Sequence, residues 1–244
     1  MQEIQFIPIS ECALLLSFGN TIDNVIHERL MLVKEKVETN PFNGFIETVP
    51  AYNSLTIFYN PVETEKTAET ISASVVHQLK QIIETSEQSP TLQANKATII
   101  IPVCYDEEYG IDLNELSVPL NLSTKEIIEL HTAREYKVFM IGFTPGFPYM
   151  GILDEQLFTK RKAQPRISVP SGSVAIAGNQ TGIYPLSTPG GWNIIGRTPL
   201  KLFDQQKEHP FLLTAGDTIQ FTPITKKEFT TLSAVENPDS GFKH

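Results

Sequence analysis

Residues 190–199 read GGWNIIGRTP, and from Gly191 to Thr198 they fit the spacing G-x-x-x-x-G-R-T, one residue away from a phosphate-binding loop of the Walker A type. Such a loop needs small residues whose backbone N–H groups surround the phosphate, followed by a helix. Here the four variable positions are Trp, Asn, Ile and Ile, which favour a β-strand. Pro199 also biases the preceding residue away from helical geometry. The segment is therefore predicted to be a strand.

The chain around this strand also has a β character. From Val138 onward, short apolar runs are interrupted by Gly and Pro, a pattern typical of many short strands joined by tight turns. The second half of the chain is therefore predicted to be a β-barrel or sandwich. The expected strands are VFMIGF (138–143), SVAIAG (173–178), GIYPL (182–186), WNIIG (192–196), PLKLF (199–203) and DTIQFTPI (217–224).

Upstream of these runs, ATIIIPVCY (97–105) is predicted to be a buried strand. Ser123 and Glu126 form a capping-box pattern, which predicts the start of a helix. We expect this helix to carry both His131 and Glu135, whose spacing of four residues would place them on one helical face.

The first 88 residues show a different order. Strands are predicted at 4–9, 12–18, 44–49 and 54–60, and helices at 21–39 and 63–87, where Ala68 begins the apolar stripe of the second helix. This ββαββα order predicts a small α+β sandwich with its helices on one face. Residues 86–96 lack apolar periodicity and are predicted to be a linker. We therefore expect an α+β domain over 1–88 and a mostly β domain over 97–235.

Composition excludes several classes of function. The 244 residues are 41% hydrophobic and carry a net charge of −9, which argues against a nucleic-acid partner. No run approaches the roughly 18 apolar residues of a membrane span, and no basic leader is present, so we expect a cytoplasmic protein without a membrane partner. No H-x-x-x-H spacing supports a metal site. Cys12 and Cys104 are expected to be buried free thiols.

Three Gly- and Pro-rich segments combine polar and aromatic side chains, at 142–151, 164–185 and 187–197. Loops of this kind on a rigid β scaffold often form small-molecule sites. The alternative is that the aromatic residues only fill the barrel. The residues expected to bind substrate or nucleotide are Phe147, Tyr149, Ser171, Gln180, Thr181, Trp192 and Arg197.

Two further residues are candidates for catalysis. His131 precedes the three segments and could serve as an acid or base near neutral pH, although a lone histidine on a helix is more often structural. Arg166 lies between a proline and a predicted strand, and its guanidinium suits a carboxylate or a phosphate.

Long stretches of the second half resemble one known family. The stretches are HTAREYKVFMIGFTPGFPYMGILD (131–154), RISVPSGSVAIAGNQTGIYPLSTPGGWNIIGRTP (166–199) and LTAGDTIQFTPI (213–224). They resemble the allophanate hydrolase subunit 1 family, whose members include the B subunit of 5-oxoprolinase and the Kip inhibitor of a sporulation histidine kinase. The first half resembles the family more loosely. The Ser-Ser-Lys residues of the amidase that hydrolyses allophanate have no counterpart here, so that activity is not implied.

The resemblance implies a cyclophilin-like barrel after the α+β domain. It implies one subunit of an ATP-dependent 5-oxoprolinase that opens 5-oxoproline to glutamate, inactive alone and using ATP with Mg²⁺. Its implied partners are a second cyclophilin-like subunit, of the type found as the C subunit of 5-oxoprolinase, and a lactam-utilisation subunit. The alternative is an inhibitor that binds a sporulation-type histidine kinase. A prolyl isomerase, with Arg166 and Phe147 as its pocket, rests on fold analogy alone.

Overall fold

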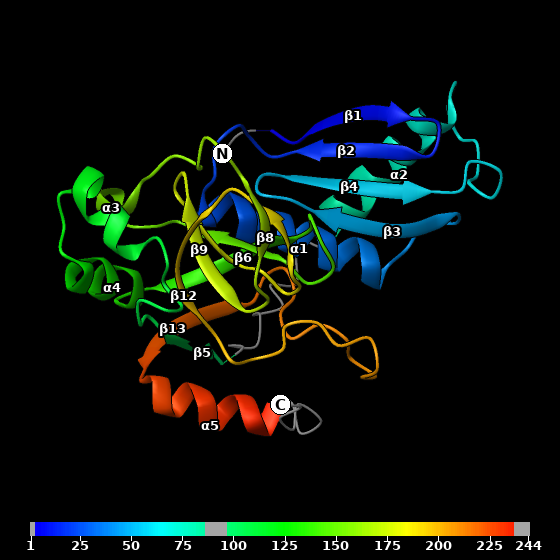
Figure 1. Ribbon diagram of the computed structural model, residues 1–244. Coiled ribbons are helices and arrows are strands. Elements are labelled where there is room, and N and C mark those ends of the chain that lie inside the picture. The colour runs from blue at the N-terminus through cyan, green and yellow to red at the C-terminus, as the bar shows by residue number, and fades with distance from the viewer. Residues whose placement is uncertain (1–2, 86–96, 237–244) are drawn as a thin grey trace. The chain divides into compact units, whose positions relative to one another are not determined.

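The computed structural model describes residues 3–85 and 97–236. The chain divides into two compact units, residues 1–95 and 96–244, which are considered separately below (Figure 1).

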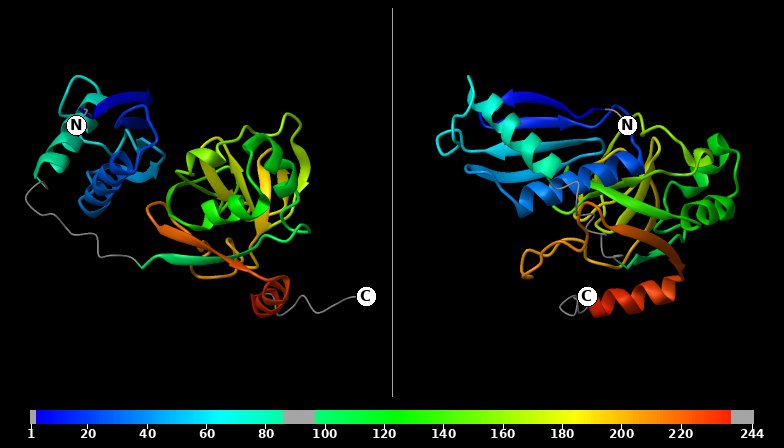
Figure 2. Two further views of the ribbon diagram at one scale, coloured as in Figure 1. Left: turned by 90° about the vertical axis from the view of Figure 1, so that its left-hand side faces the viewer. Right: turned by 180° about the vertical axis from the view of Figure 1, so that it is seen from behind.

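The first unit is a four-stranded antiparallel sheet with two helices. Its strands follow the order β1-β2-β4-β3, and the chain order is the predicted ββαββα. Both helices lie on the same face of the sheet, as the views in Figure 2 show. The elements are β1 (Gln5–Ser10), β2 (Ala13–Ser17), α1 (Asn24–Thr39), β3 (Phe45–Pro50), β4 (Ser54–Tyr59) and α2 (Ile71–Thr85).

Local hydrogen bonds decide where these two helices begin. The side chain of Asp23 accepts hydrogen bonds from the N–H groups of Val25 and Ile26, which fixes the start of α1. In the same way Thr70 accepts a hydrogen bond from the N–H of Ala73, so α2 begins at Ile71. The prediction that the second helix starts near residue 63 and includes Ala68 was therefore wrong. The predicted linker, 86–96, lies outside the described residues.

One face of this sheet packs against the helices and the other does not. Side chains alternate between the two faces of a strand, and the inner set forms a core with the helices, including Leu14, Leu16, Leu30, Leu55, Ile57 and Leu79. On the opposite face, paired residues form a row across the four strands β1, β2, β4 and β3. The row is Ile7, Leu15, Thr56 and Val49. Ile7 and Val49 are both exposed, so this face carries apolar surface.

The second unit is built around a closed seven-stranded barrel. Its strands follow the cyclic order β10-β7-β6-β13-β5-β12-β9, and all neighbours are antiparallel except β13 and β5, which are parallel. These strands are β5 (Ile99–Cys104), β6 (Glu135–Ile141), β7 (Pro148–Gly151), β9 (Ser173–Ala177), β10 (Gln180–Ile183), β12 (Asn193–Arg197) and β13 (Thr218–Ile224).

Other elements surround the barrel. Strands β8 (Arg166–Val169) and β11 (Thr188–Gly190) form a separate two-stranded sheet, and a 3₁₀ turn spans Glu155–Leu157. The helices are α3 (Leu113–Leu120), α4 (Thr124–Thr132) and α5 (Lys226–Glu236). Ser123 and Glu126 form the predicted capping box at the start of α4.

The barrel wall separates two apolar clusters. All seven strands contribute to the larger one, which is therefore the barrel interior, and helices α3 and α4 add Leu113, Leu116 and Ile127 to it. Along β9, Val174 and Ile176 belong to this interior, whereas the alternating Ala175 and Ala177 belong to a second cluster. Because neighbouring side chains of a strand point to opposite faces, the second cluster lies on the outside of the wall.

Several local predictions for this half were wrong. Residues 199–203 form a loop with a single bridge between Phe203 and Phe211, because Pro199 has no N–H to donate and the N–H of Leu200 donates to the Thr198 side chain instead of to a neighbouring strand. Helix α4 ends at Thr132 and Glu135 begins β6, so His131 and Glu135 share no helical face.

The two cysteines have different surroundings. Both are free, as predicted; Cys104 is buried in β5, but Cys12 is exposed because it lies in the turn between β1 and β2. Over the described ranges, no helix has both the length and the apolar character that a membrane span requires.

Candidate functional site

The segment GGWNIIGR forms strand β12 and its approach, as its bulky residues predict. Asn193, Ile194, Gly196 and Arg197 pair with β9, and Arg197 also pairs with Cys104 of β5. Ile194 and Ile195 are fully buried on opposite sides of the wall. The segment therefore has no phosphate-binding loop.

An aromatic cluster covers the outer face of the wall beside β12. The Phe147 ring lies 5.2 Å from the Tyr184 ring and 5.6 Å from the Trp192 ring, both edge to face, and 4.8 Å from the ring of Tyr149. Phe147 and Trp192 are almost completely buried, whereas Tyr149 is half-buried. Phe143 packs on Phe147 but remains 60% exposed. Three of the predicted binding residues thus meet here, mostly as packed core.

Arg161 is the charged residue of this cluster. Its guanidinium carbon lies 5.9 Å from the centre of the Trp192 ring, within the range of a cation–π contact. Burial raises the pKa values of Tyr149 and Tyr184, and the nearby charge of Arg161 partly offsets both rises. The arginine, itself exposed, therefore covers the side of the aromatic cluster formed by Trp192.

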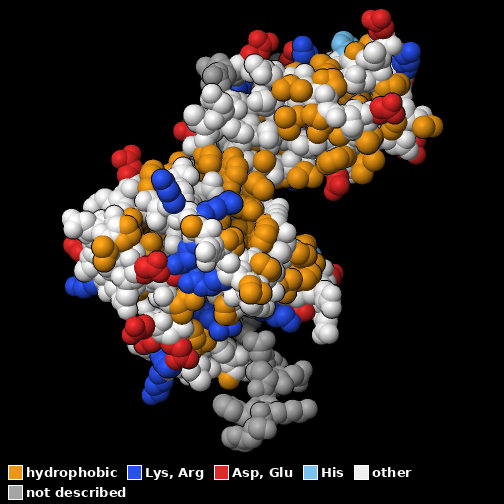
Figure 3. Space-filling view, turned by 45° about the horizontal axis from the view of Figure 1, so that its top comes forward, with side chains coloured by type: hydrophobic (Ala, Val, Ile, Leu, Met, Phe, Trp, Pro, Cys, Tyr) orange, Lys and Arg blue, Asp and Glu red, His pale blue; other side chains and the backbone are white. Residues whose placement is uncertain are grey.

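A basic pocket adjoins Arg161. It has a volume of about 430 Å³, and three of the residues that line it are basic while one, Glu115, is acidic and paired with Lys162. The full lining is Glu115, Leu116, Pro119, Thr159, Lys160, Arg161, Lys162, Ala163, Gln164 and Asn193. Figure 3 shows Lys and Arg side chains gathered on one face of the barrel unit, among apolar side chains. Within a chain of net charge −9, such a pocket favours an anionic ligand.

Arg166 belongs to a buried ion network. Its Nη2 atom lies 2.6 Å from Oδ1 of Asp112, a residue that is 1% exposed, and the same oxygen accepts from Lys162 Nζ at 2.7 Å. The other carboxylate oxygen accepts from the backbone N–H of Ile194 at 2.7 Å. Asp112 therefore holds β8, β12 and the basic segment together. The catalytic role of Arg166 stays a prediction, and its geometry favours a positioning role.

His131 lies inside the barrel, with none of its surface exposed. Its ring stacks on Phe221 at 4.5 Å, its Nδ1 atom is 2.8 Å from the Tyr105 hydroxyl, and its Nε2 atom is 2.9 Å from the Thr181 hydroxyl. Burial lowers the pKa of His131 to about 3, so the ring is neutral at pH 7. Its predicted role as acid or base stays a prediction, and the geometry favours packing.

The other predicted binding residues, Ser171, Gln180, Thr181 and Arg197, lie apart from the basic pocket. Ser171 donates to the Pro185 carbonyl, and its own carbonyl accepts from Arg197 Nε at 2.8 Å, so both stabilise a turn. Gln180 is half-buried at the start of β10, and Thr181 faces the interior. The predicted residues thus do not line one cleft. His131 and Thr181 form an interior pair, Phe147, Tyr149 and Trp192 an aromatic cluster, and Ser171 and Arg197 a turn, while Gln180 and Arg166 belong to none of these groups. Phe147 is too deeply buried to bind a proline ring.

The basic pocket was not predicted from the sequence, although Lys160, Arg161 and Lys162 are three consecutive basic residues in an acidic chain.

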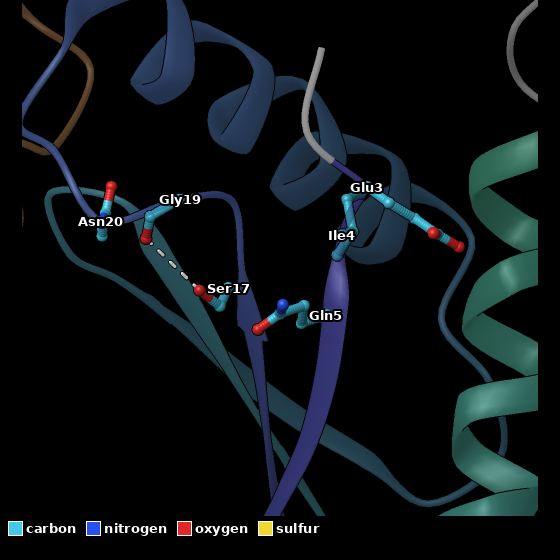
Figure 4. A pocket seen from close by; sticks show the side chains of 6 residues that line it. All are labelled: Glu3, Ile4, Gln5, Ser17, Gly19 and Asn20. Atoms are coloured by element: carbon cyan, nitrogen blue, oxygen red, sulfur yellow. Dashed lines mark hydrogen bonds between the residues drawn. The ribbon is translucent and has the colours of Figure 1, made fainter.

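A pocket of about 450 Å³ in the first unit is different in character. It lies where β1 begins and β2 ends, and Ser17 Oγ donates to the Gly19 carbonyl at its wall (Figure 4). Of the described residues that line it, none is Lys or Arg: Glu3, Ile4, Gln5, Ser17, Gly19 and Asn20. Within the described ranges, no three His, Cys, Asp or Glu residues are grouped to hold a metal ion.

Comparison with known proteins relates most of the chain to one family. Residues 4–213 match the family model described as carboxyltransferase domain, subdomain C and D. The 5-oxoprolinase B subunit of Bacillus subtilis (strain 168) is 41% identical over 223 residues, which are 91% of this chain and 93% of that protein. The 5-oxoprolinase B subunit of Escherichia coli O157:H7 is 38% identical over 91% of this chain and 97% of its own.

Solved structures agree with this relationship. The crystal structure of TTHA0988 matches with a TM-score of 0.74 and 35% identity. The match covers 87% of this chain but only 40% of the TTHA0988 chain. The urea amidolyase of K. lactis also has a TM-score of 0.74, over 96% of this chain and 16% of its own, but at 16% identity it shows a common fold alone. The chain therefore belongs to the family of carboxyltransferase-domain subdomains C and D, together with the bacterial 5-oxoprolinase B subunits.

Proposed function

We propose that this chain is one subunit of an ATP-dependent 5-oxoprolinase, which opens the ring amide of 5-oxoproline to give glutamate. The observation that carries the proposal is the identity of 37–41% to three 5-oxoprolinase B subunits over about nine-tenths of the chain. In this reaction one water molecule is added across the amide bond, and a second is consumed when ATP is cleaved to ADP and phosphate. Mg²⁺ is expected to arrive bound to the nucleotide.

The geometry supports a role in holding anions and partners. The basic pocket at Lys160 and Arg161 suits a phosphate or a carboxylate. His131 is enclosed and the thiol of Cys104 is buried, so neither is placed to attack a substrate in this state. The chain is therefore expected to be inactive alone and to act with a second barrel subunit and a lactam-utilisation subunit.

Phe143 is the contact that we assign to the second barrel subunit. It is 60% exposed, and its φ of 65° is unusual for a bulky residue, yet packing against Phe147 and Tyr184 holds it in place. An exposed aromatic side chain on a rigid base is typical of an interface hot spot. TTHA0988 extends well beyond the region that matches this chain, which is compatible with a partner fused to it.

The proposal is tested by measuring ADP release that depends on 5-oxoproline, first with this chain alone and then with the two candidate partners added. Turnover in the complete mixture only is the expected result. If folded and associated partners give no turnover, the proposal is wrong. Histidine-kinase inhibition, which stays a prediction from the sequence resemblance, is then tested by kinase autophosphorylation.

The interface is tested separately. Phe143→Ala should weaken the affinity for the second barrel protein at least tenfold, the effect of losing about 1.4 kcal/mol. Val235→Ala, which also removes an exposed apolar side chain from this unit, should leave association unchanged. Equal affinities for the two variants, measured by titration calorimetry, would show that Phe143 is not part of the interface.

A further inference from the structure

The segment Thr159–Lys162 presents two cations, Lys160 and Arg161, to which the residues at 3–85 and 97–236 offer no acidic partner. Lys162 is paired with Asp112 and Glu115, but within the described part of the chain neither Lys160 nor Arg161 forms an ion pair. Both are exposed, and both line the basic pocket. The two uncompensated charges lie at adjacent positions, on the rim of a cavity large enough for a small ligand.

The backbone that carries these cations is held on both sides. Thr159 exchanges two backbone hydrogen bonds with Gly178, and the N–H of Lys162 donates to the Gly191 carbonyl at 2.7 Å. Between them, the side-chain amide of Asn193 donates to the Lys160 carbonyl at 2.9 Å. The segment is thus fixed to the barrel before any ligand arrives, which reduces the entropy cost of binding.

The arginine also contacts an aromatic ring. Its guanidinium carbon lies 5.9 Å from the centre of the Trp192 ring, within the range of a cation–π contact, and its N–H groups can still donate to an anion. One guanidinium can contact an aromatic ring with its face and bind an oxyanion with its N–H groups at the same time. Thr159 and Gln164 add a hydroxyl and an amide to the same pocket.

We propose that this pocket binds the phosphate chain of a nucleoside triphosphate, with Lys160 and Arg161 as the contacting cations; this rests on the proposed ATP-dependent function. Two free cations beside a third, acid-paired lysine match several phosphate groups in a row better than a single carboxylate. The carboxylate of the lactam is the competing anion, and the experiment includes it.

Trp192 makes the binding measurable in this chain alone, because it is the only tryptophan in the sequence. Phosphate that binds Arg161 places negative charge beside the indole, because the guanidinium carbon lies 5.9 Å from the ring centre. We therefore expect a saturable change in tryptophan emission when ATP or inorganic tripolyphosphate is added, and none when 5-oxoproline is added over the same range. Titration calorimetry gives each affinity independently of the fluorescence.

Variants locate the site. Lys160→Ala and Arg161→Ala should each weaken the binding of ATP and tripolyphosphate on the order of tenfold, as the loss of a charged hydrogen bond predicts. Lys207→Ala removes the same charge from an exposed residue that does not line the pocket and should bind normally. Arg161→Lys keeps the charge but loses the planar guanidinium fork, and an intermediate affinity is expected.

The outcomes separate this inference from the proposed function. If tripolyphosphate and ATP do not bind the chain, or bind all four variants equally, the pocket is not a phosphate site, whatever the complete mixture does. If 5-oxoproline alone changes the emission, the pocket binds the lactam carboxylate and the inference is wrong. If triphosphate binding depends on Lys160 and Arg161 but the complete mixture does not turn over 5-oxoproline, the proposed function alone fails.

Discussion

The Nε2 atom of His131 lies 2.9 Å from the hydroxyl oxygen of Thr181, a residue 50 positions away on a neighbouring part of the barrel. The Thr181 hydroxyl also lies within donating distance of the Ala175 carbonyl, so it accepts from Nε2–H. The remaining ring nitrogen then accepts from the Tyr105 hydroxyl. Both ring nitrogens are thus satisfied in the neutral form, and a proton added at Nδ1 would displace the hydrogen bond that the Tyr105 hydroxyl donates there.

This arrangement predicts a loss of stability in acid. The folded pKa of His131 is about 3, below the ordinary value of 6.5, so the unfolded chain takes up a proton that the folded chain does not. The contribution of His131 to the unfolding free energy should be fully present above pH 6.5 and should fall by about 1.4 kcal/mol per pH unit between pH 6.5 and about 3. The measurement is urea unfolding of the wild type and of His131→Gln at a series of pH values.

The variant supplies the control, because glutamine does not titrate. The difference in unfolding free energy between wild type and His131→Gln should shrink as the pH falls. Parallel curves for the two proteins would show that His131 titrates normally. Folded His131→Gln should also retain turnover in the complete mixture, since the ring is enclosed; complete loss of turnover would support the catalytic role instead.

Asp112 and Glu115 bind the same lysine in different surroundings. Asp112→Ala leaves Arg166 and Lys162 without their buried counter-charge and Ile194 N–H without an acceptor, so we expect a loss of about 3 kcal/mol or more in unfolding free energy. Glu115 is 75% exposed, and Glu115→Ala should cost less than about 1 kcal/mol. Chemical denaturation measures both; similar costs would contradict the importance of burial.

Two adjacent glycines give an equally direct comparison. A Cβ atom on Gly190 would lie 2.3 Å from the hydroxyl of Tyr184, which is buried, so Gly190→Ala should destabilise the fold by about 1–3 kcal/mol. A Cβ atom on Gly191 would meet its nearest neighbour, Pro165, at 3.6 Å, an ordinary contact. Gly191→Ala should therefore be nearly neutral. Thermal unfolding followed by Trp192 emission distinguishes them, and equal melting temperatures would refute the steric argument.

The capping box of α4 makes a further prediction. Ser123 Oγ accepts from the N–H of Glu126, and the Glu126 carboxylate accepts from the Ser123 N–H. Ser123→Ala removes half of this exchange and should cost about 1 kcal/mol of stability. Ser117 lies inside α3, where alanine is a better helix former, so Ser117→Ala should be neutral or slightly stabilising. A larger loss for Ser117→Ala, in urea unfolding, would contradict the capping argument.

The local sequence was sufficient to predict an element wherever residues close together in the chain determine its conformation. The bulky residues of WNIIG made a strand and excluded a phosphate loop, and the Ser123 and Glu126 pair started a helix at the predicted position. The boundaries that failed depended on single side chains. Thr70 delays the start of α2, and the break after Thr132 moves Glu135 into a strand.

The candidate site was predicted less well, because barrel closure decides which side of the wall each side chain occupies. Thr181 and Gln180 are adjacent and read alike in the sequence, yet Thr181 faces the interior. Irregular register within β6 and β12 shifts the alternation further, and no local pattern reveals it.

By itself, the sequence determined the ββαββα order of the first half, the β12 strand, the start of α4 and the family to which the chain belongs, whereas helices α3 and α5 were not predicted. Only the tertiary structure buried His131 beside Thr181, paired Arg166 with Asp112, and placed Arg161 over Trp192 next to a basic pocket. The physical reason is that these contacts join residues far apart in the chain, such as the 50 positions between His131 and Thr181. Their meeting depends on how seven strands close into a barrel, and not on the propensities of the residues that surround each of them.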